Sequence, residues 1–154
     1  MAGGGRRREG AEGAALRLLA LREHSRSELR RKLLARGYAE AEIEEALDRL
    51  AARGDLDETR FVEALTRSEL ERGRGLLSVR AKLARAGLPE GRPAAGREEE
   101  RRALLRLLEN RGLHPGTLTD GKERARIWRF LKGRGFSPAL LREVFGSGDT
   151  EDAP

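Results

Sequence analysis

The sequence predicts an all-α fold, and three observations lead to this prediction. Residues that favour β-strands are scarce, with three Val, two Ile, five Thr, four Phe, one Tyr and one Trp among the 154 residues. The dominant residues Leu, Ala, Glu and Arg all favour helices. No segment alternates apolar and polar residues, whereas several, such as Ile43, Ala46 and Leu47, repeat apolar residues at the i, i+3 and i+4 spacing of a helix face.

The supply of apolar residues indicates several small cores rather than one thick core. Leu, Ile, Val and Phe amount to 34 residues, while 38% of the chain is charged and the net charge is +6. Such a composition lies just above the range in which disorder is expected. The chain has no cysteine, which excludes disulfides and thiolate metal sites. No apolar run is long enough to cross a bilayer, so we expect a soluble, cytoplasmic protein.

One local pattern occurs three times, at residues 29–38, 79–88 and 127–136. In each copy an apolar residue stands four before a Gly and another follows the Gly directly. This spacing is typical of a helix that ends in a left-handed Gly, after which the next side chain folds back onto the last turn. The structural residues that we expect to build the three ends are Leu33, Gly37 and Tyr38, then Leu83, Gly87 and Leu88, then Leu131, Gly135 and Phe136.

The spacing of these copies favours an internal duplication, since the three glycines are 50 and 48 residues apart. We expect three tandem three-helix repeats that stack into an elongated array. The predicted helices span residues 14–23, 26–36, 40–53, 58–72, 76–86, 97–111, 120–134 and 138–145. The third helix of the second repeat, at 89–96, is broken by Pro89, Gly91, Pro93 and Gly96. The predicted organisation is a disordered basic tail at 1–13, repeats at 14–56, 57–96 and 97–146, and a disordered acidic tail at 147–154.

The order and spacing of five motifs resemble the RecX family, bacterial regulators of the RecA recombinase. The motifs lie at residues 22–33, 54–61, 72–75, 83–88 and 129–137. The resemblance implies helical repeats, no enzymatic activity, and binding in the helical groove of the RecA–single-stranded-DNA filament, where filament growth, ATP turnover and strand exchange would be restrained. Two features depart from the family pattern: Glu58 replaces a common Asp, and the third helix of the second repeat is broken.

The residues themselves also argue against an enzyme. The two histidines, His24 and His114, lack the spacing of metal ligands, and His24 is interpreted as a solvated turn residue before a helix cap. Residues 116–122 match G-x-x-x-x-G-K, but Glu123 stands where a phosphate-binding loop needs Ser or Thr. We interpret this segment as a linker ahead of a helix at about 120. We therefore expect no catalytic residue, no metal and no cofactor, and we expect a monomer.

The positive charge is concentrated in the second and third repeats. Residues 59–88 and 120–145 each carry a net charge of +4, whereas residues 14–58 carry −1. If the repeats stack, their basic side chains would form one strip. Such a strip would bind phosphates or an acidic protein groove. The alternatives are ordinary solvated helix faces and an Arg content set by a G+C-rich genome. The candidate partner-binding or nucleic-acid-binding residues are Arg30, Arg31, Lys32, Arg36, Arg60, Arg72, Arg74, Arg80, Lys82, Arg85, Arg129, Lys132 and Arg134.

Two functions remain open on these observations. The first is a modulator that binds the RecA filament, with single-stranded DNA in or beside it. The second is a helical nucleic-acid-binding protein that acts without a protein partner.

Overall fold

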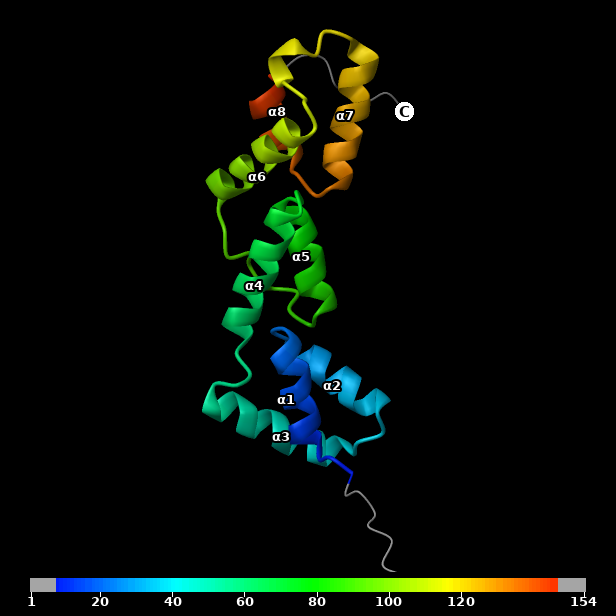
Figure 1. Cartoon of the computed structure of the whole chain (residues 1–154), viewed down its shortest axis with the longest axis vertical. Coiled ribbons are helices and arrows are strands. Elements are labelled where there is room, and N and C mark those ends of the chain that lie inside the picture. Colours follow the sequence, from blue (N-terminus) through cyan, green and yellow to red (C-terminus); the bar gives the residue numbers. More distant parts are fainter. Residues whose placement is uncertain (1–7, 147–154) are drawn as a thin grey trace, which may run out of the picture. The chain divides into compact units, whose positions relative to one another are not determined.

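The structure is a computed structural model that describes residues 8–146. Within this range it contains eight α-helices, one short 3₁₀ turn and no strand, which confirms the all-α prediction (Figure 1). The helices are α1 (Ala11–Leu21), α2 (Arg26–Ala35), α3 (Glu40–Arg53), α4 (Glu58–Glu71), α5 (Leu76–Arg85), α6 (Arg97–Asn110), α7 (Gly121–Gly133) and α8 (Pro138–Phe145), with the 3₁₀ turn at Pro115–Thr117.

The first helix begins earlier than predicted, which corrects the boundary of the N-terminal tail. Ala11, placed by the sequence analysis in a disordered tail at 1–13, opens α1 and is 1% exposed. Its N–H donates to the Glu42 carboxylate of α3 at 3.1 Å. Apart from Met1, the tail contains no large apolar side chain, so the sequence could not reveal that a small Ala fits against α3. The remainder of that tail, residues 1–7, and the acidic tail at 147–154 lie outside the described residues.

The three repeated helix ends have the geometry that their spacing predicts. Gly37, Gly87 and Gly135 have φ angles of 85°, 82° and 91°, which is the left-handed region. In each case the residue after the Gly donates its N–H to the carbonyl of the residue four positions before the Gly. For the N–H of Leu88 and the carbonyl of Leu83 the distance is 2.9 Å. Leu33, Leu83 and Leu131, which supply these carbonyls, are fully buried. The same arrangement ends α4 at Gly73 and α6 at Gly112, two ends that the sequence analysis did not single out.

The chain divides into two compact units, with the division between Phe61 and Val62. In the first unit, α1, α2 and α3 lie against one another (Figure 1). They enclose a core of small and branched side chains. Ala15, Leu29, Leu33, Ile43 and Leu47 are fully buried there. The Ser25 hydroxyl caps α2 by accepting from the N–H of Glu28 at 3.1 Å, as its position in the sequence predicts.

The second unit begins at Val62, within α4, and contains the third repeat and all of the predicted second repeat except residues 57–61. Residues 86–96 form no helix, in agreement with the glycines and prolines there, and the N–H of Ala94 donates to the buried Thr66 hydroxyl of α4 at 3.0 Å. The third repeat packs α6, α7 and α8 around a separate core that includes Leu104, Leu131, Phe136 and Leu141. The second and third repeats thus form one compact unit, while the stacking of all the repeats into an elongated array stays a prediction.

Backbone contacts join the second repeat to the third. Gly75, the N-cap of α5, has no side chain that could cap the helix. The third repeat supplies the missing acceptors instead: the carbonyl of Arg134 accepts from Gly75 N–H at 3.0 Å, and that of Gly135 accepts from Leu77 N–H at 3.1 Å. The N–H of Leu76 donates to the Glu100 carboxylate of α6 at 2.8 Å. The start of α5 is therefore capped by two helices of the neighbouring repeat.

This junction requires glycine at two positions. Gly75 and Gly135 are both buried, and a Cβ atom on Gly75 would overlap the carbonyl group of Gly135. A Cβ on Gly135 would lie 2.6 Å from the amide nitrogen of Ser78. In the other direction, the Arg134 guanidinium donates to the carbonyls of Gly73, at 3.0 Å, and Arg72 at the end of α4. The two repeats are thus joined by hydrogen bonds to main-chain groups on both sides of the junction.

We expect Gly75→Ala to destabilise the second unit by about 1–3 kcal/mol, because the new methyl group forces the two backbones apart. Gly133→Ala is the matched control: it lies at the end of α7, a Cβ there meets nothing within 4 Å, and replacing a helical Gly by Ala gains about 0.5–1 kcal/mol. Urea unfolding followed by circular dichroism measures both. Equal stabilities of the two variants would contradict the close approach of the repeats.

Candidate interaction surface

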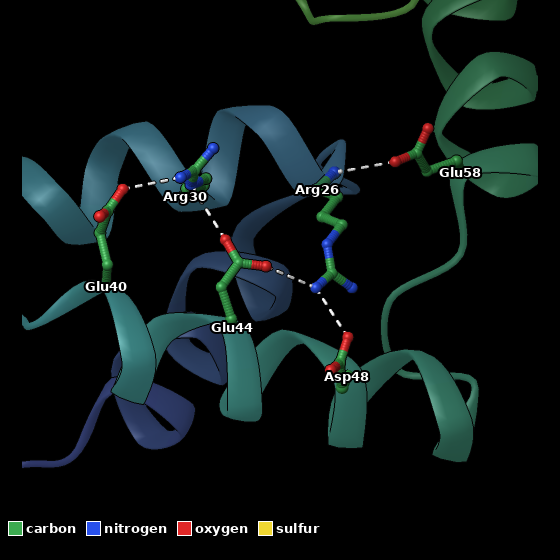
Figure 2. A network of polar contacts seen from close by, with 6 residues as sticks. All are labelled: Arg26, Arg30, Glu40, Glu44, Asp48 and Glu58. Atoms are coloured by element: carbon green, nitrogen blue, oxygen red, sulfur yellow. Dashed lines mark hydrogen bonds and ion pairs between the residues drawn. The ribbon is translucent and has the colours of Figure 1, made fainter.

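Three of the five candidate basic residues of the first unit, Arg30, Lys32 and Arg60, are engaged within the protein. Figure 2 shows Arg30 of α2 between Glu40 and Glu44 of α3, at 2.7 and 3.0 Å. The neighbouring Arg26 pairs with Glu44 and Asp48, at 2.8 and 2.7 Å, and its N–H donates to Glu58 (Figure 2). These contacts tie α2 to α3 and neutralise much of the positive charge on this face.

Arg60 is a second candidate of the first unit that binds internal groups. Its guanidinium lies 3.0 Å from Glu23 and donates to the carbonyl of Gly54 at 2.7 Å. The hydrogen bond to Glu23 raises the pKa of Arg60, partly offset by burial. In contrast, Arg31 and Arg36 are exposed and form no ion pair with a residue in the range 8–146.

Lys32 lies in a contact that the sequence did not indicate. Its ammonium group donates to Nε2 of His24 at 2.9 Å, and Nδ1 of the same ring donates to the carbonyl of Arg22 at 3.0 Å. His24 is 1% exposed, so the interpretation of a solvated turn residue is wrong. The ring fills the turn between α1 and α2 next to the cap Ser25, and burial lowers the pKa of both His24 and Lys32. His24 is therefore a neutral, structural histidine.

Four candidate cations of the second unit face solvent. Arg80 and Arg85 of α5 and Arg129 and Lys132 of α7 are exposed, and none forms an ion pair with any of residues 8–146. We call these four residues the exposed cation set. Because no carboxylate of the described residues lies within ion-pair distance of these four groups, their charges can attract an approaching anion.

The remaining candidates of the second unit gather at the turn between α4 and α5. Arg72, Arg74 and Lys82 surround the carboxylate of Glu69, and Arg134 binds the carbonyls of the same turn. The structure thus brings together four candidates that are up to 62 residues apart in the sequence. Glu69 itself could not be found from the sequence, because nothing local marks one Glu of an amphipathic helix as buried.

Two exposed cations of α7 were missed by the sequence analysis. Lys122 and Arg126 precede Arg129 at helical spacing and share its exposed face; Arg126 makes one long contact of 3.9 Å with Glu123. Lys122 and Arg126 lie before the repeat motif, which begins at Ile127, so the motif does not include them. The i, i+4, i+7 spacing of 122, 126 and 129 is the signal that would have identified them.

No cluster of side chains suited to a metal ion accompanies these surfaces in the described part of the chain. Among residues 8–146 no three His, Asp or Glu side chains are grouped so that they could hold a metal ion. No helix in this range is long and apolar enough to cross a membrane. The segment that resembles a phosphate-binding loop, residues 116–122, overlaps the turn Pro115–Thr117 and leads into α7, where the Asp120 carboxylate accepts from the N–H of Lys122.

Comparison with known proteins identifies the family. The chain is 42% identical over 139 residues to the regulatory protein RecX of Acidithiobacillus ferrooxidans, and 90% of each chain is covered. It is 36% identical over 147 residues to that of Halorhodospira halophila, covering 94% of this chain and 91% of the relative. The chain belongs to the RecX family.

Two further comparisons agree with this membership. The family model for the first three-helix domain of RecX matches residues 11–50, which lie in α1–α3 and the turns between them. The crystal structure of RecX from Lactobacillus salivarius has the same fold, with a TM-score of 0.67 over 87% of this chain and 91% of that one, at 19% identity. The RecX relatives are named regulatory proteins.

The buried His24 predicts a pH dependence for this RecX-family protein. Because burial lowers its pKa below the ordinary 6.5, the unfolded chain takes up a proton that the folded chain resists, so stability falls as the pH falls below about 6.5. In His24→Gln this component is absent. We expect the melting temperature of the natural protein to fall more than that of the variant between pH ~7.5 and pH ~5.5. Parallel changes in the two proteins would contradict a neutral, buried His24.

Proposed function

We propose that the protein binds the filament of the RecA recombinase on single-stranded DNA, lies in its helical groove, and restrains filament growth, ATP turnover and strand exchange. It does so as a binding protein without enzymatic activity of its own. The proposal is supported by membership in the RecX family and by the regulatory role that the relatives' names state. The structural observation that supports this proposal is the exposed cation set.

The exposed cation set suits a partner that presents negative charge along an extended path. Its four members lie on α5 and α7, in two different repeats of one compact unit. The backbone junction at Gly75 and Gly135 fixes these two helices relative to each other. Contacts held at fixed separations reinforce one another, because the second contact forms at a high effective concentration once the first has formed.

The direct test adds purified protein to RecA on single-stranded DNA and measures DNA-dependent ATPase and strand exchange. We expect both to fall with increasing protein. Unchanged ATPase and strand exchange at stoichiometric excess would reject the proposal.

The same cations also support a second candidate, a helical nucleic-acid-binding protein that needs no protein partner. It predicts strongly salt-dependent binding to bare DNA, with no preference for a strand coated by RecA. Comparing binding to coated and bare strands at one salt concentration separates the two functions.

We expect replacement of the exposed cation set by Gln (Arg80, Arg85, Arg129 and Lys132) to weaken filament binding by ~10-fold or more while helicity is unchanged, since these side chains make no internal ion pairs. The charge-matched control replaces four other exposed residues, Arg17, Arg92, Arg102 and Arg142, by Gln. Filament affinity measured by co-sedimentation should fall much less in the control. An equal loss in both would mean that only net charge matters.

A further inference from the structure

A buried carboxylate lies at the centre of the turn between α4 and α5. The side chain of Glu69 is 1% exposed, yet it carries a charge partner on several sides. Its carboxylate accepts from the Lys82 ammonium at 2.6 Å and from the Ser78 hydroxyl at 3.0 Å, both on α5. Two guanidinium groups approach from the end of α4, with Nη1 of Arg74 at 3.6 Å and Nη1 of Arg72 at 3.9 Å.

The cations cover the carboxylate and face outward. The exposed fractions of the side chains are 65% for Arg72, 39% for Arg74 and 30% for Lys82. An anion that comes from solvent therefore meets three positive groups, while the single negative charge beneath them is out of reach. Burial raises the pKa of Glu69, but the contacts with Lys82 and Ser78 outweigh it and hold the pKa below its ordinary value, so the carboxylate stays ionised.

The two guanidinium groups keep their hydrogen-bond donors for an external acceptor. At 3.6 and 3.9 Å both are beyond hydrogen-bonding distance of Glu69, so the carboxylate attracts them without using their N–H groups. Neither guanidinium donates a hydrogen bond to any residue in the range 8–146. Each guanidinium presents a planar fork that matches two oxygens of a phosphate.

The main chain that carries these groups is fixed from both sides. Gly73 has a φ of 70°, and the N–H of Arg74 donates to the carbonyl of Glu69 at 3.0 Å. From the third repeat, Arg134 donates to the carbonyls of Arg72 and Gly73. The main-chain positions of Arg72 and Arg74 are thus set before any ligand arrives.

We propose that Arg72, Arg74 and Lys82 form a clamp for a backbone phosphate of single-stranded nucleic acid, and that Glu69 is the positioning residue that gathers them. The clamp is separate from the exposed cation set, whose members have no such internal anchor. A phosphate fits the site because its several oxygens accept from three converging donors at once. This proposal rests on the proposed function in one respect: the DNA strand of the filament is taken as the source of the phosphate.

Glu69→Gln gives a test in which two accounts predict opposite signs. The substitution keeps the shape and an acceptor for Lys82 but removes a negative charge, so general electrostatic attraction predicts tighter binding of nucleic acid. If Glu69 positions the clamp, its loss releases the guanidinium groups and binding weakens; we expect a ~3-fold or larger increase in Kd. Fluorescence anisotropy with a labelled oligo(dT) measures Kd, and circular dichroism checks the melting temperature. Unchanged or tighter binding by a folded variant would overturn the positioning role.

A second variant keeps the clamp testable if Glu69→Gln fails to fold. Arg72→Ala with Arg74→Ala removes two groups that hold the same phosphate, and the slope of log K against log salt for oligo(dT) should become shallower by ~0.7, because each lost phosphate contact on a single strand contributes ~0.7. The matched control, Arg67→Ala with Arg106→Ala, removes the same charge from exposed sites of α4 and α6 and should leave the slope nearly unchanged. Equal slopes in the two double variants would overturn the clamp.

The experiments can reject the phosphate ligand of the clamp and the proposed function separately. If the Arg72 and Arg74 double variant binds oligo(dT) like its control but no longer binds the RecA filament, the cluster contacts an acidic protein surface and the phosphate assignment is wrong. If the natural protein leaves RecA ATPase unchanged while the oligo(dT) results follow the clamp, the proposed function fails and the clamp stands.

Discussion

The second unit depends on one close approach of two backbones, at Gly75 and Gly135. The start of α5 donates N–H groups to carbonyls at the end of α7, and no side chain separates the two backbone segments there. An uncapped helix start would leave buried N–H groups without acceptors, and the third repeat supplies those acceptors together with Glu100. The same junction fixes α5 relative to α7, and therefore fixes the cations that the two helices carry.

Charge is used differently in the two units. In the first unit, Arg26, Arg30 and Arg60 are held by carboxylates of the same unit, so their positive charge mainly ties helices together. In the second unit, the exposed cation set has no such partners among the described residues, and the cluster at Glu69 holds three cations on a single carboxylate. An excess of positive charge thus remains available on the second unit, in the part of the chain where the sequence places most of its net charge.

The helices were predictable from the sequence because their signals are local. A left-handed Gly with one apolar residue four before it and another directly after it marks the end of α2, α5 and α7, and the cap residue Ser25 marks the start of α2. Burial of a small or polar residue depends instead on distant partners. Ala11 packs because α3 is adjacent, His24 is buried because Lys32 and Arg22 satisfy its ring nitrogens, and the role of Glu69 requires α5 beside α4. No local pattern in the sequence encodes these contacts.

We propose that the second and third repeats present the surface that meets the filament. An electron cryomicroscopy structure of the protein bound to RecA on single-stranded DNA would test it most directly. We expect the exposed faces of α5 and α7 and the turn at Arg72 and Arg74 to contact the filament. A complex in which α1–α3 alone make the contacts, with α5 and α7 facing solvent, would contradict it.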